Sequence, residues 1–167
     1  MVERTAREQQ RYRLEFRAFG LLARREHSRT ELATKLTTRP MKGEGWEPPD
    51  SEILKELLDS LAERNLQSDS RFAESFSRDR INRGRGPMKL RAEMRERGVS
   101  DELQRDALTE LDVDWLEQAV DVRRRRFGLA KVEEFKEKAR QMRFLQSRGF
   151  SQGQISHAMR MVEDDIL

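Results

Sequence analysis

Two arginine-rich segments hold the side chains best suited to binding chemistry in this sequence. Residues 78–97 contain eight basic and three acidic residues, and residues 121–148 contain ten basic and four acidic residues. Arginine far outnumbers lysine, and its guanidinium group forms paired hydrogen bonds with phosphates and carboxylates. This pattern indicates an anionic partner, either a nucleic-acid backbone or an acidic protein surface.

The two segments lie at different kinds of helical element. Gly84-Arg85-Gly86 interrupts a helical pattern, and Pro87 suits the first position of the next helix, where its missing N–H costs little. A helix N-terminus at Pro87 would attract an anion. The run Arg123–Arg126 places positive charge all around one helical turn, and we expect one of its side chains to point toward a neighbouring module.

Catalytic and metal-binding motifs are absent from the sequence. It has no cysteine, and its two histidines, His27 and His157, lie far apart. It has no Walker A, HExxH, GxSxG or EF-hand calcium-loop pattern. We expect His27 at the surface beside a helix cap and His157 partly buried. The sequence therefore predicts a protein that is not an enzyme and needs no metal or cofactor.

The composition predicts a charged protein with a small apolar core. Of the 167 residues, 39% are charged and 35% are hydrophobic, and the net charge is +3. The basic segments alternate with acidic ones, and residues 44–74 contain three basic and nine acidic residues. No apolar run could span a membrane, and the polar N-terminus does not resemble a signal peptide. We expect a cytoplasmic protein with one basic and one acidic face.

Helical patterns follow one another along the chain, and strand patterns are nearly absent. We expect the first helix to span about Arg11 to Arg25, followed by a capping box at Ser28–Glu31. Leu116 is expected among the inward-facing side chains of a later helix, and the helix after it includes Phe135, Met142 and Leu145.

An internal repeat relates two parts of the sequence. MRERGVSDELQRDAL (94–108) aligns with LQSRGFSQGQISHAM (145–159) at a constant offset of 51 residues. A helix end, an apolar residue and the next N-cap coincide in Gly98–Ser100 and Gly149–Ser151. We favour three stacked three-helix modules over one globule of six to nine helices, because several caps and helix ends agree at once.

The predicted fold is therefore all-α, with three tandem helix-turn-helix-like repeats of three helices in an elongated, curved array. The expected divisions are a flexible tail (1–10), a first module (11–66) with a variable loop (38–49), a second module (67–112) and a third module (113–167).

One segment in the middle of the sequence resembles a known family. SDSRFAESFSRDRINRGRGPMKLRAEMRERGVS (68–100) is similar to the signature region of the RecX family, regulators of the RecA recombinase. The positions that carry the resemblance are Asp69, Arg71, Phe72, Ala73, Arg80, Gly84, Gly86, Pro87, Leu90 and Gly98. Residues 21–36 and 143–155 are similar to the first and third modules of that family. Asn65-Leu66 depart from the family pattern, which has glycine and an aromatic residue there.

The resemblance implies a function. Such a protein binds in the groove of the RecA–single-stranded DNA filament. The resemblance also allows direct contact with DNA, either with single strands or, without sequence specificity, with duplexes. It inhibits the recombinase, ATPase and coprotease activities of RecA, which damps recombination and the SOS response. The curved repeat favours a monomer.

The candidate contacts to RecA or DNA are basic residues of the segments described above. They are Arg24, Arg25, Arg80, Arg83, Arg85, Lys89, Arg91, Arg95, Arg123, Arg124, Arg125, Arg126, Arg143 and Arg148. The alternative hypothesis is a self-standing helix-turn-helix DNA-binding protein, which would show a salt-resistant preference for one duplex sequence. An enzyme is the third hypothesis, and the missing motifs argue against it.

Overall fold

The structure is a computed structural model that describes residues 5–38 and 46–162, and these residues form nine α-helices and no strand. The helices are α1 (Ala6–Leu22), α2 (Arg29–Thr37), α3 (Ser51–Glu63), α4 (Asp69–Asn82), α5 (Pro87–Glu96), α6 (Asp101–Leu111), α7 (Trp115–Phe127), α8 (Phe135–Arg148) and α9 (Gln152–Arg160). The prediction of an all-α fold is confirmed. Most of the expected loop at 38–49 lies outside the described residues.

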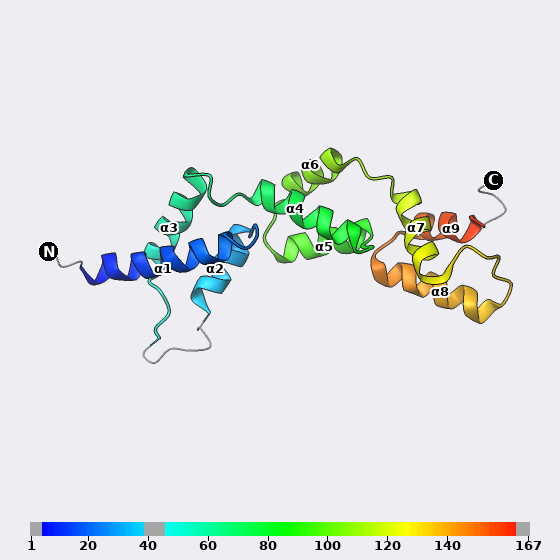
Figure 1. The fold of residues 1–167 in the computed structure, drawn as a ribbon, viewed down its shortest axis with the longest axis horizontal. Helices are drawn as coiled ribbons and strands as arrows, with labels where there is room; N and C mark the ends of the chain where they lie inside the picture. The colour runs from blue at the N-terminus through cyan, green and yellow to red at the C-terminus, as the bar shows by residue number, and fades with distance from the viewer. Residues whose placement is uncertain (1–4, 39–45, 163–167) are drawn as a thin grey trace.

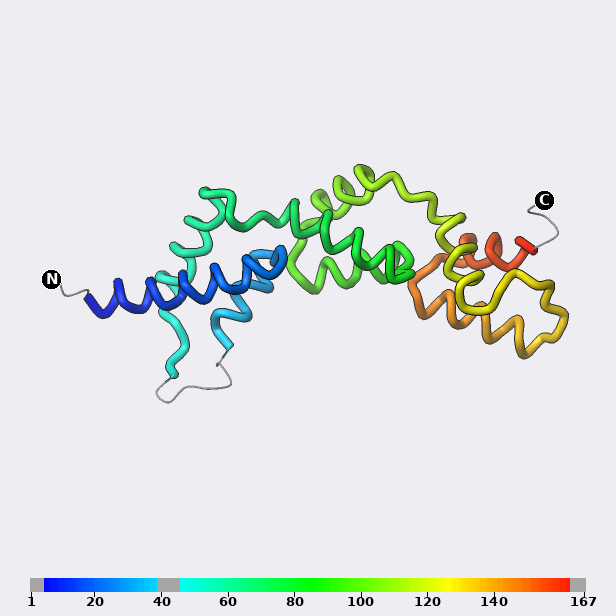
Figure 2. The backbone as a smooth tube through the Cα atoms, in the orientation of Figure 1, coloured from blue at the N-terminus to red at the C-terminus, as the bar shows by residue number. Residues whose placement is uncertain are grey.

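The helices form an elongated array in chain order (Figure 1). Helices α1–α3 lie at one end, α4–α6 lie in the middle, and α7–α9 lie at the other end (Figure 2). The molecule therefore offers a long surface rather than one enclosed cleft.

Each group of three helices surrounds its own apolar cluster. The clusters include Leu32 and Leu57 in the first group, Phe72 and Met94 in the second, and Val120 and Ile155 in the third. Trp115, at the start of α7, packs against both the second and the third cluster. Burial of these side chains is the main force that holds each group together.

Helix α1 begins earlier than the sequence predicts. The side chain of Thr5 accepts a hydrogen bond from the Glu8 amide, and the Glu8 carboxylate accepts one from the Thr5 amide at 2.8 Å. This capping box stabilises the first turn. Residues 6–10 are therefore helical, and the expected flexible tail is wrong for them; the helix also ends at Leu22 rather than Arg25.

Only half of the predicted capping box at Ser28 is present. The Ser28 hydroxyl accepts a hydrogen bond from the Glu31 amide at 3.0 Å. The Glu31 carboxylate, however, binds the Arg25 guanidinium instead of the Ser28 amide. A complete box, like that of Thr5 and Glu8, is also present at the start of α9, between Ser151 and Gln154.

Three side chains lie in environments that the helical pattern did not predict. His27 is buried, with 2% of its surface exposed, whereas Phe135 is 83% exposed and Leu116 is 44% exposed. Phe135 is the first residue of α8, and the buried side chains of that helix, Gln141 and Leu145, come later. The expectation that Leu116 points inward is therefore wrong, as is the surface position of His27.

The second and third groups of helices meet end to end. The Gly86 amide donates a hydrogen bond to the carbonyl of Arg148 at 2.7 Å, and the Met88 amide donates one to the carbonyl of Gly149 at 3.0 Å. A Cβ atom on Gly86 would lie 2.5 Å from the carbonyl carbon of Gly149. The N-terminus of α5 is thus occupied by protein carbonyls, and the predicted anion site beside Pro87 is wrong.

The first and second groups meet through polar contacts. The Ser28 hydroxyl donates a hydrogen bond to the carbonyl of Arg97 at 2.6 Å. The Arg29 amide donates one to the Asp69 carboxylate at 2.7 Å, and the Gln67 amide group donates one to the carbonyl of His27. These bonds fix the start of α2 against the α5–α6 turn and the start of α4.

Candidate nucleic-acid and protein interface

Four of the predicted site residues surround one hollow at the junction of the second and third helix groups. The hollow has a volume of about 220 Å³. Its lining residues are Asn82, Arg83, Gly84, Val122, Arg125, Arg126, Phe144 and Arg148, and none of them is acidic. We call this feature the arginine hollow. It concentrates positive charge from three helices at one place.

The arginines of the hollow come from the C-terminal ends of three helices. Arg83 is the C-cap of α4, Arg125 and Arg126 lie in the last turn of α7, and Arg148 is the last residue of α8. A helix C-terminus carries partial negative charge on its free carbonyls, which favours cations nearby. This effect offsets part of the repulsion among the guanidinium groups and lets them gather without carboxylates between them.

The arginines differ in how far the protein already engages them. Arg125 and Arg126 are exposed, and neither makes an ion pair within the part of the chain that the structure describes. Arg83 binds the Asp79 carboxylate at 3.0 Å. Arg148 lies over the Phe144 ring, 5.1 Å from its centre, and reaches the carbonyl of Arg83 at 3.4 Å. The hollow therefore retains unbalanced positive charge at Arg125 and Arg126.

A second hollow, of about 440 Å³, lies between the first and second helix groups. Its charged lining residues are Arg25, Arg80, Arg83 and Arg97 together with Glu26, Glu31 and Asp79. Arg83 lines both hollows, so it connects them along α4. This second surface is mixed in charge, and it is the weaker candidate for an anionic partner.

Arg25 is engaged by a nearby carboxylate. Its two terminal nitrogens lie 2.6 and 3.0 Å from the oxygens of Glu31. The hydrogen bond with Glu31 raises the pKa of Arg25. Burial opposes ionisation of Glu31, but the hydrogen bond from Arg25 and the surrounding cations outweigh it and lower the pKa of Glu31.

Several other predicted arginines pair with carboxylates of the chain itself. Glu93 lies between two of them, with one oxygen 3.1 Å from Arg80 Nε and the other 3.5 Å from Arg85 Nε. Two further pairs are more exposed, Arg95 with Asp101 at 3.6 Å and Arg124 with Asp121 at 3.3 Å. These ion pairs reduce the positive charge that is available to a partner.

Arg123 was predicted as a contact residue, and the structure corrects this prediction. Only 1% of its surface is exposed. Its guanidinium donates to the Gln141 side chain at 2.9 Å, to the carbonyls of Ala158 and Met161 at 2.8 and 2.7 Å, and to the carbonyl of Ala130 at 3.3 Å. Burial lowers the pKa of Arg123. The side chain holds its own module together and does not point toward a neighbour.

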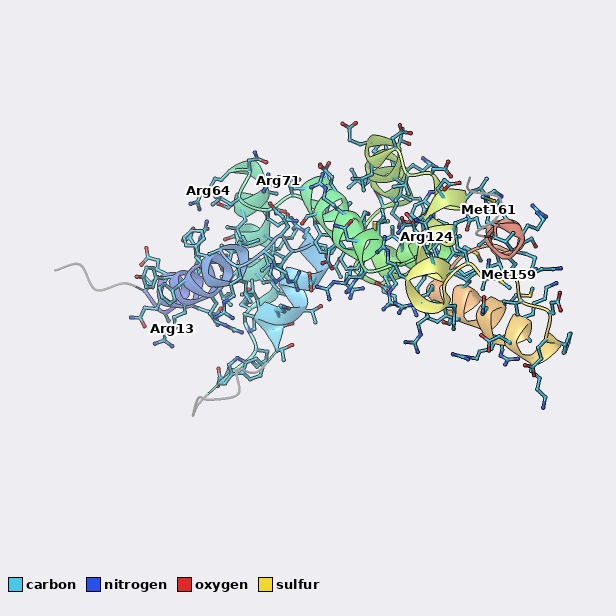
Figure 3. All side chains as sticks on the ribbon, turned by 45° about the vertical axis from the view of Figure 1, so that its right-hand side comes forward. Arg13, Arg64, Arg71, Arg124, Met159 and Met161 are labelled. Atoms are coloured by element: carbon cyan, nitrogen blue, oxygen red, sulfur yellow. The ribbon has the colours of Figure 1, made fainter. Side chains whose placement is uncertain are left out.

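The remaining candidates do not join either hollow. Arg24, Arg91 and Arg143 are exposed and make no ion pair within the described ranges. Lys89 donates a hydrogen bond to the carbonyl of Ser147 at 3.1 Å. Figure 3 shows basic side chains along the whole array, with Arg13, Arg64 and Arg71 on its first half and Arg124 on its second. The basic residues of the predicted basic face are therefore spread along the array, and four of them gather around the arginine hollow.

Sequence reasoning missed the role of Phe144 in lining the hollow. Its ring supports Arg148 and meets Phe127 edge to face, with the ring centres 5.2 Å apart. The helical periodicity points to its neighbour Leu145 as the core residue, and Leu145 is indeed fully buried. The arginine density around Phe144 was the available signal, but spacing alone could not place the ring beneath a guanidinium.

The described residues contain neither a metal-binding cluster nor a membrane-spanning helix. No group of three histidine, aspartate or glutamate side chains there is placed to hold a metal ion. No helix among those residues combines the length and the apolar character needed to cross a membrane.

Comparisons with known proteins agree on one family. Residues 68–108 match the family model described as "RecX, second three-helix domain", and residues 112–159 match "RecX, third three-helix domain". The chain is 43% identical over 148 residues to Regulatory protein RecX of Halorhodospira halophila, covering 89% of this chain and 87% of that protein. It is 46% identical over 142 residues to Regulatory protein RecX of Chromohalobacter salexigens, covering 85% and 88%.

A solved structure shares the fold. The crystal structure of RecX from Lactobacillus salivarius superposes with a TM-score of 0.71 at 20% identity, covering 95% of this chain and 99% of that one.

Proposed function

The chain belongs to the RecX family of regulatory proteins, and from that premise we propose that it is a negative regulator of RecA. It binds as a monomer in the groove of the RecA–single-stranded DNA filament, in the cytoplasm. There it inhibits the recombinase, ATPase and coprotease activities without catalysing a reaction itself. The consequence is weaker recombination and a weaker SOS response.

The observation that supports this proposal most directly is the arginine hollow. Arg83, Arg125, Arg126 and Arg148 line it, and no carboxylate does. Guanidinium groups bind phosphates and carboxylates in a paired geometry, so the hollow suits a DNA backbone or an acidic protein loop. Both kinds of anion are available on a nucleoprotein filament.

The shape of the molecule supports the same partner. The three groups of helices in the described residues, α1–α3, α4–α6 and α7–α9, follow one another along the longest axis of the molecule (Figure 1). Arrays of stacked repeats present long surfaces to extended partners. A row of modules can contact successive subunits of a filament, and the arginine hollow then lies in its second half.

The test is ATP hydrolysis by RecA on single-stranded DNA with increasing amounts of this protein. We expect hydrolysis to fall, and we expect Arg125→Glu with Arg126→Glu to raise the half-inhibiting concentration about tenfold or more. Arg125 and Arg126 are preferred to Arg83 for this test, because Arg83 already pairs with Asp79.

The matched control reverses two exposed charges elsewhere, Arg105→Glu with Arg160→Glu, which have no ion pair within the described residues. This control changes the net charge equally and should inhibit like the unmodified protein. Undiminished hydrolysis at saturating protein would refute the proposal. Salt-resistant preference for one duplex sequence would instead favour a self-standing DNA-binding protein.

A further inference from the structure

An apolar groove lies on the third helix group, away from the arginine hollow. It has a volume of about 430 Å³ and lies between α8 and α9, which pack together at the end of the array (Figure 1). Its lining residues are Phe135, Lys138, Ala139, Met142, Arg143, Gln146, Gln152 and Ile155, none of which lines the arginine hollow. We call it the α8–α9 groove.

The groove exposes apolar surface that the fold does not use. Phe135 is 83% exposed, although a large aromatic side chain gains most from burial. Met142 is half-buried, and Ile155 is buried and belongs to the core below. Exposed apolar surface that is contiguous and rimmed by polar groups marks an interaction site more often than a scattered residue does.

The sequence of α8 places one cation on each side of this apolar surface. Phe135, Ala139, Met142 and Gln146 follow the i, i+4, i+7, i+11 spacing of a single helix face. At about 100° per residue, Lys138 lies roughly 60° to one side of Phe135 and Arg143 roughly 80° to the other. The apolar stripe is therefore flanked by positive charge along both edges.

These two cations are available to a partner. Lys138 and Arg143 make no ion pair within the residues that the structure describes, and the groove has no acidic lining residue. Two carboxylates of the region, Glu134 and Glu137, line an adjacent hollow that shares Phe135, Ala139 and Arg143 with the groove. Glu137 is engaged, since it accepts hydrogen bonds from Arg140 at 2.9 Å and from Gln141 at 3.0 Å.

We propose that the α8–α9 groove docks an acidic segment of a partner protein that inserts one large apolar side chain between Phe135 and Ile155. The apolar side chain fills the groove, and carboxylates on either side of it meet Lys138 and Arg143. A volume of 430 Å³ falls within the range of roughly 300–1,000 Å³ that is usual for binding pockets. This inference goes beyond the proposed function, because it requires neither DNA nor a RecA filament.

The test measures binding of a fluorescein-labelled peptide, Glu-Asp-Glu-Leu-Phe-Asp-Glu-Asp, by fluorescence anisotropy. We expect the full chain to bind it and to show shifts in the ¹³C-methyl resonances of Met142 and Ile155. Phe135→Ala should weaken binding about tenfold, and so should Lys138→Glu with Arg143→Glu. Because Phe135 is mostly exposed, its truncation leaves the core intact.

Two controls make the result specific. Arg105→Glu with Arg160→Glu lowers the net charge by the same amount outside the groove and should bind like the unmodified chain. A peptide with Ser-Ser in place of Leu-Phe keeps all its carboxylates and should bind about tenfold more weakly or worse.

The proposal is overturned if both peptides bind equally, which would show charge attraction alone, or if neither binds. It is also overturned if the free chain forms dimers in sedimentation that Phe135→Ala abolishes, because the groove would then serve a second copy. Each of these outcomes is independent of whether the chain inhibits RecA.

Discussion

The amide of Gly86 donates a 2.7 Å hydrogen bond to the carbonyl of Arg148, and this bond joins the start of α5 to the end of α8. The positive end of one helix dipole thereby meets the negative end of another. The same contact holds the backbone of Arg148 next to Arg83, so the arginine hollow depends on how these two helices meet.

Gly86 is predicted to be intolerant of a side chain. In Gly86→Ala the new methyl group would lie 2.5 Å from the Gly149 carbonyl carbon, and backbone atoms cannot yield cheaply. We expect a loss of about 1–3 kcal/mol in the free energy of unfolding and faster amide exchange at Met88. The measurements are urea denaturation and hydrogen exchange.

Gly20→Ala is the matched control for this substitution. A Cβ on Gly20 meets nothing within 4 Å, and the residue lies inside α1. Alanine should therefore stabilise the protein by about 0.5–1 kcal/mol, since glycine disfavours helix interiors. If both alanine variants had the same stability, the close packing of Gly86 on Gly149 would be wrong.

Arg123→Ala is predicted to be among the most destabilising single changes in the third module. It would leave the carbonyls of Ala158 and Met161 without donors and open a cavity beneath α9. We expect a loss of about 3 kcal/mol or more in urea denaturation. Arg123→Lys should not restore stability, because an ammonium group cannot span four acceptors.

The neighbouring residue gives the contrast for Arg123. Arg124 is half-exposed and makes a single 3.3 Å ion pair with Asp121. Arg124→Ala should therefore change stability by no more than about 0.5 kcal/mol. Equal losses at the two positions would argue against the buried role of Arg123.

Stability is predicted to fall as the pH drops below neutrality because of His27. Burial lowers the pKa of His27, with Lys35 and Arg25 adding repulsion, despite the hydrogen bond from its Nδ1 to the Arg25 carbonyl at 3.0 Å. The unfolded chain therefore binds a proton at about pH 6.5 that the folded chain binds only at lower pH. Protonation then favours the unfolded state.

The measurement for His27 is the melting temperature between about pH 7.5 and pH 5.5, where ordinary carboxylates stay ionised. The unmodified chain should lose more stability over this interval than His27→Gln does. Parallel curves for the two proteins would show that His27 does not titrate differently in the folded and unfolded chains.

The salt dependence of DNA binding is predicted to report on the arginine hollow. Each phosphate contact to single-stranded DNA adds about 0.7 to the slope of log K against log salt concentration. Arg125→Ala with Arg126→Ala should lower that slope by up to about 1.4 if each side chain contacts one phosphate. Arg105→Ala with Arg160→Ala should leave it unchanged, and an unchanged slope in the first variant would remove the hollow from the DNA contact.

The sequence predicted what short stretches of chain determine. Ser100 and Ser151 cap their helices as the pattern indicated, because a hydroxyl reaches an amide three residues away. Gly98 and Gly149 adopt positive φ angles after helix ends, which the repeat also marked. These features are local, and so spacing reveals them.

The prediction failed where distant parts of the chain meet. Arg123 is buried because carbonyls 35 and 38 residues further on accept its hydrogen bonds. His27 is buried at the junction of two modules, where Gln67, 40 residues away, donates a hydrogen bond to its carbonyl. Likewise, Arg83 and Arg125 line the same hollow only because two modules dock there, and helical periodicity does not encode that docking.

The position of Trp115 makes the two joints of the array different in kind. Its ring connects the second and third apolar clusters, whereas among the described residues no side chain packs against both the first and the second cluster. An apolar contact between two helix groups opposes any movement that would expose its area to water, whereas a few hydrogen bonds allow the two groups to rotate relative to each other. Hydrogen bonds join the first helix group to the second, but no shared apolar side chain does, so we expect the array to bend more at that joint than at the joint between α4–α6 and α7–α9.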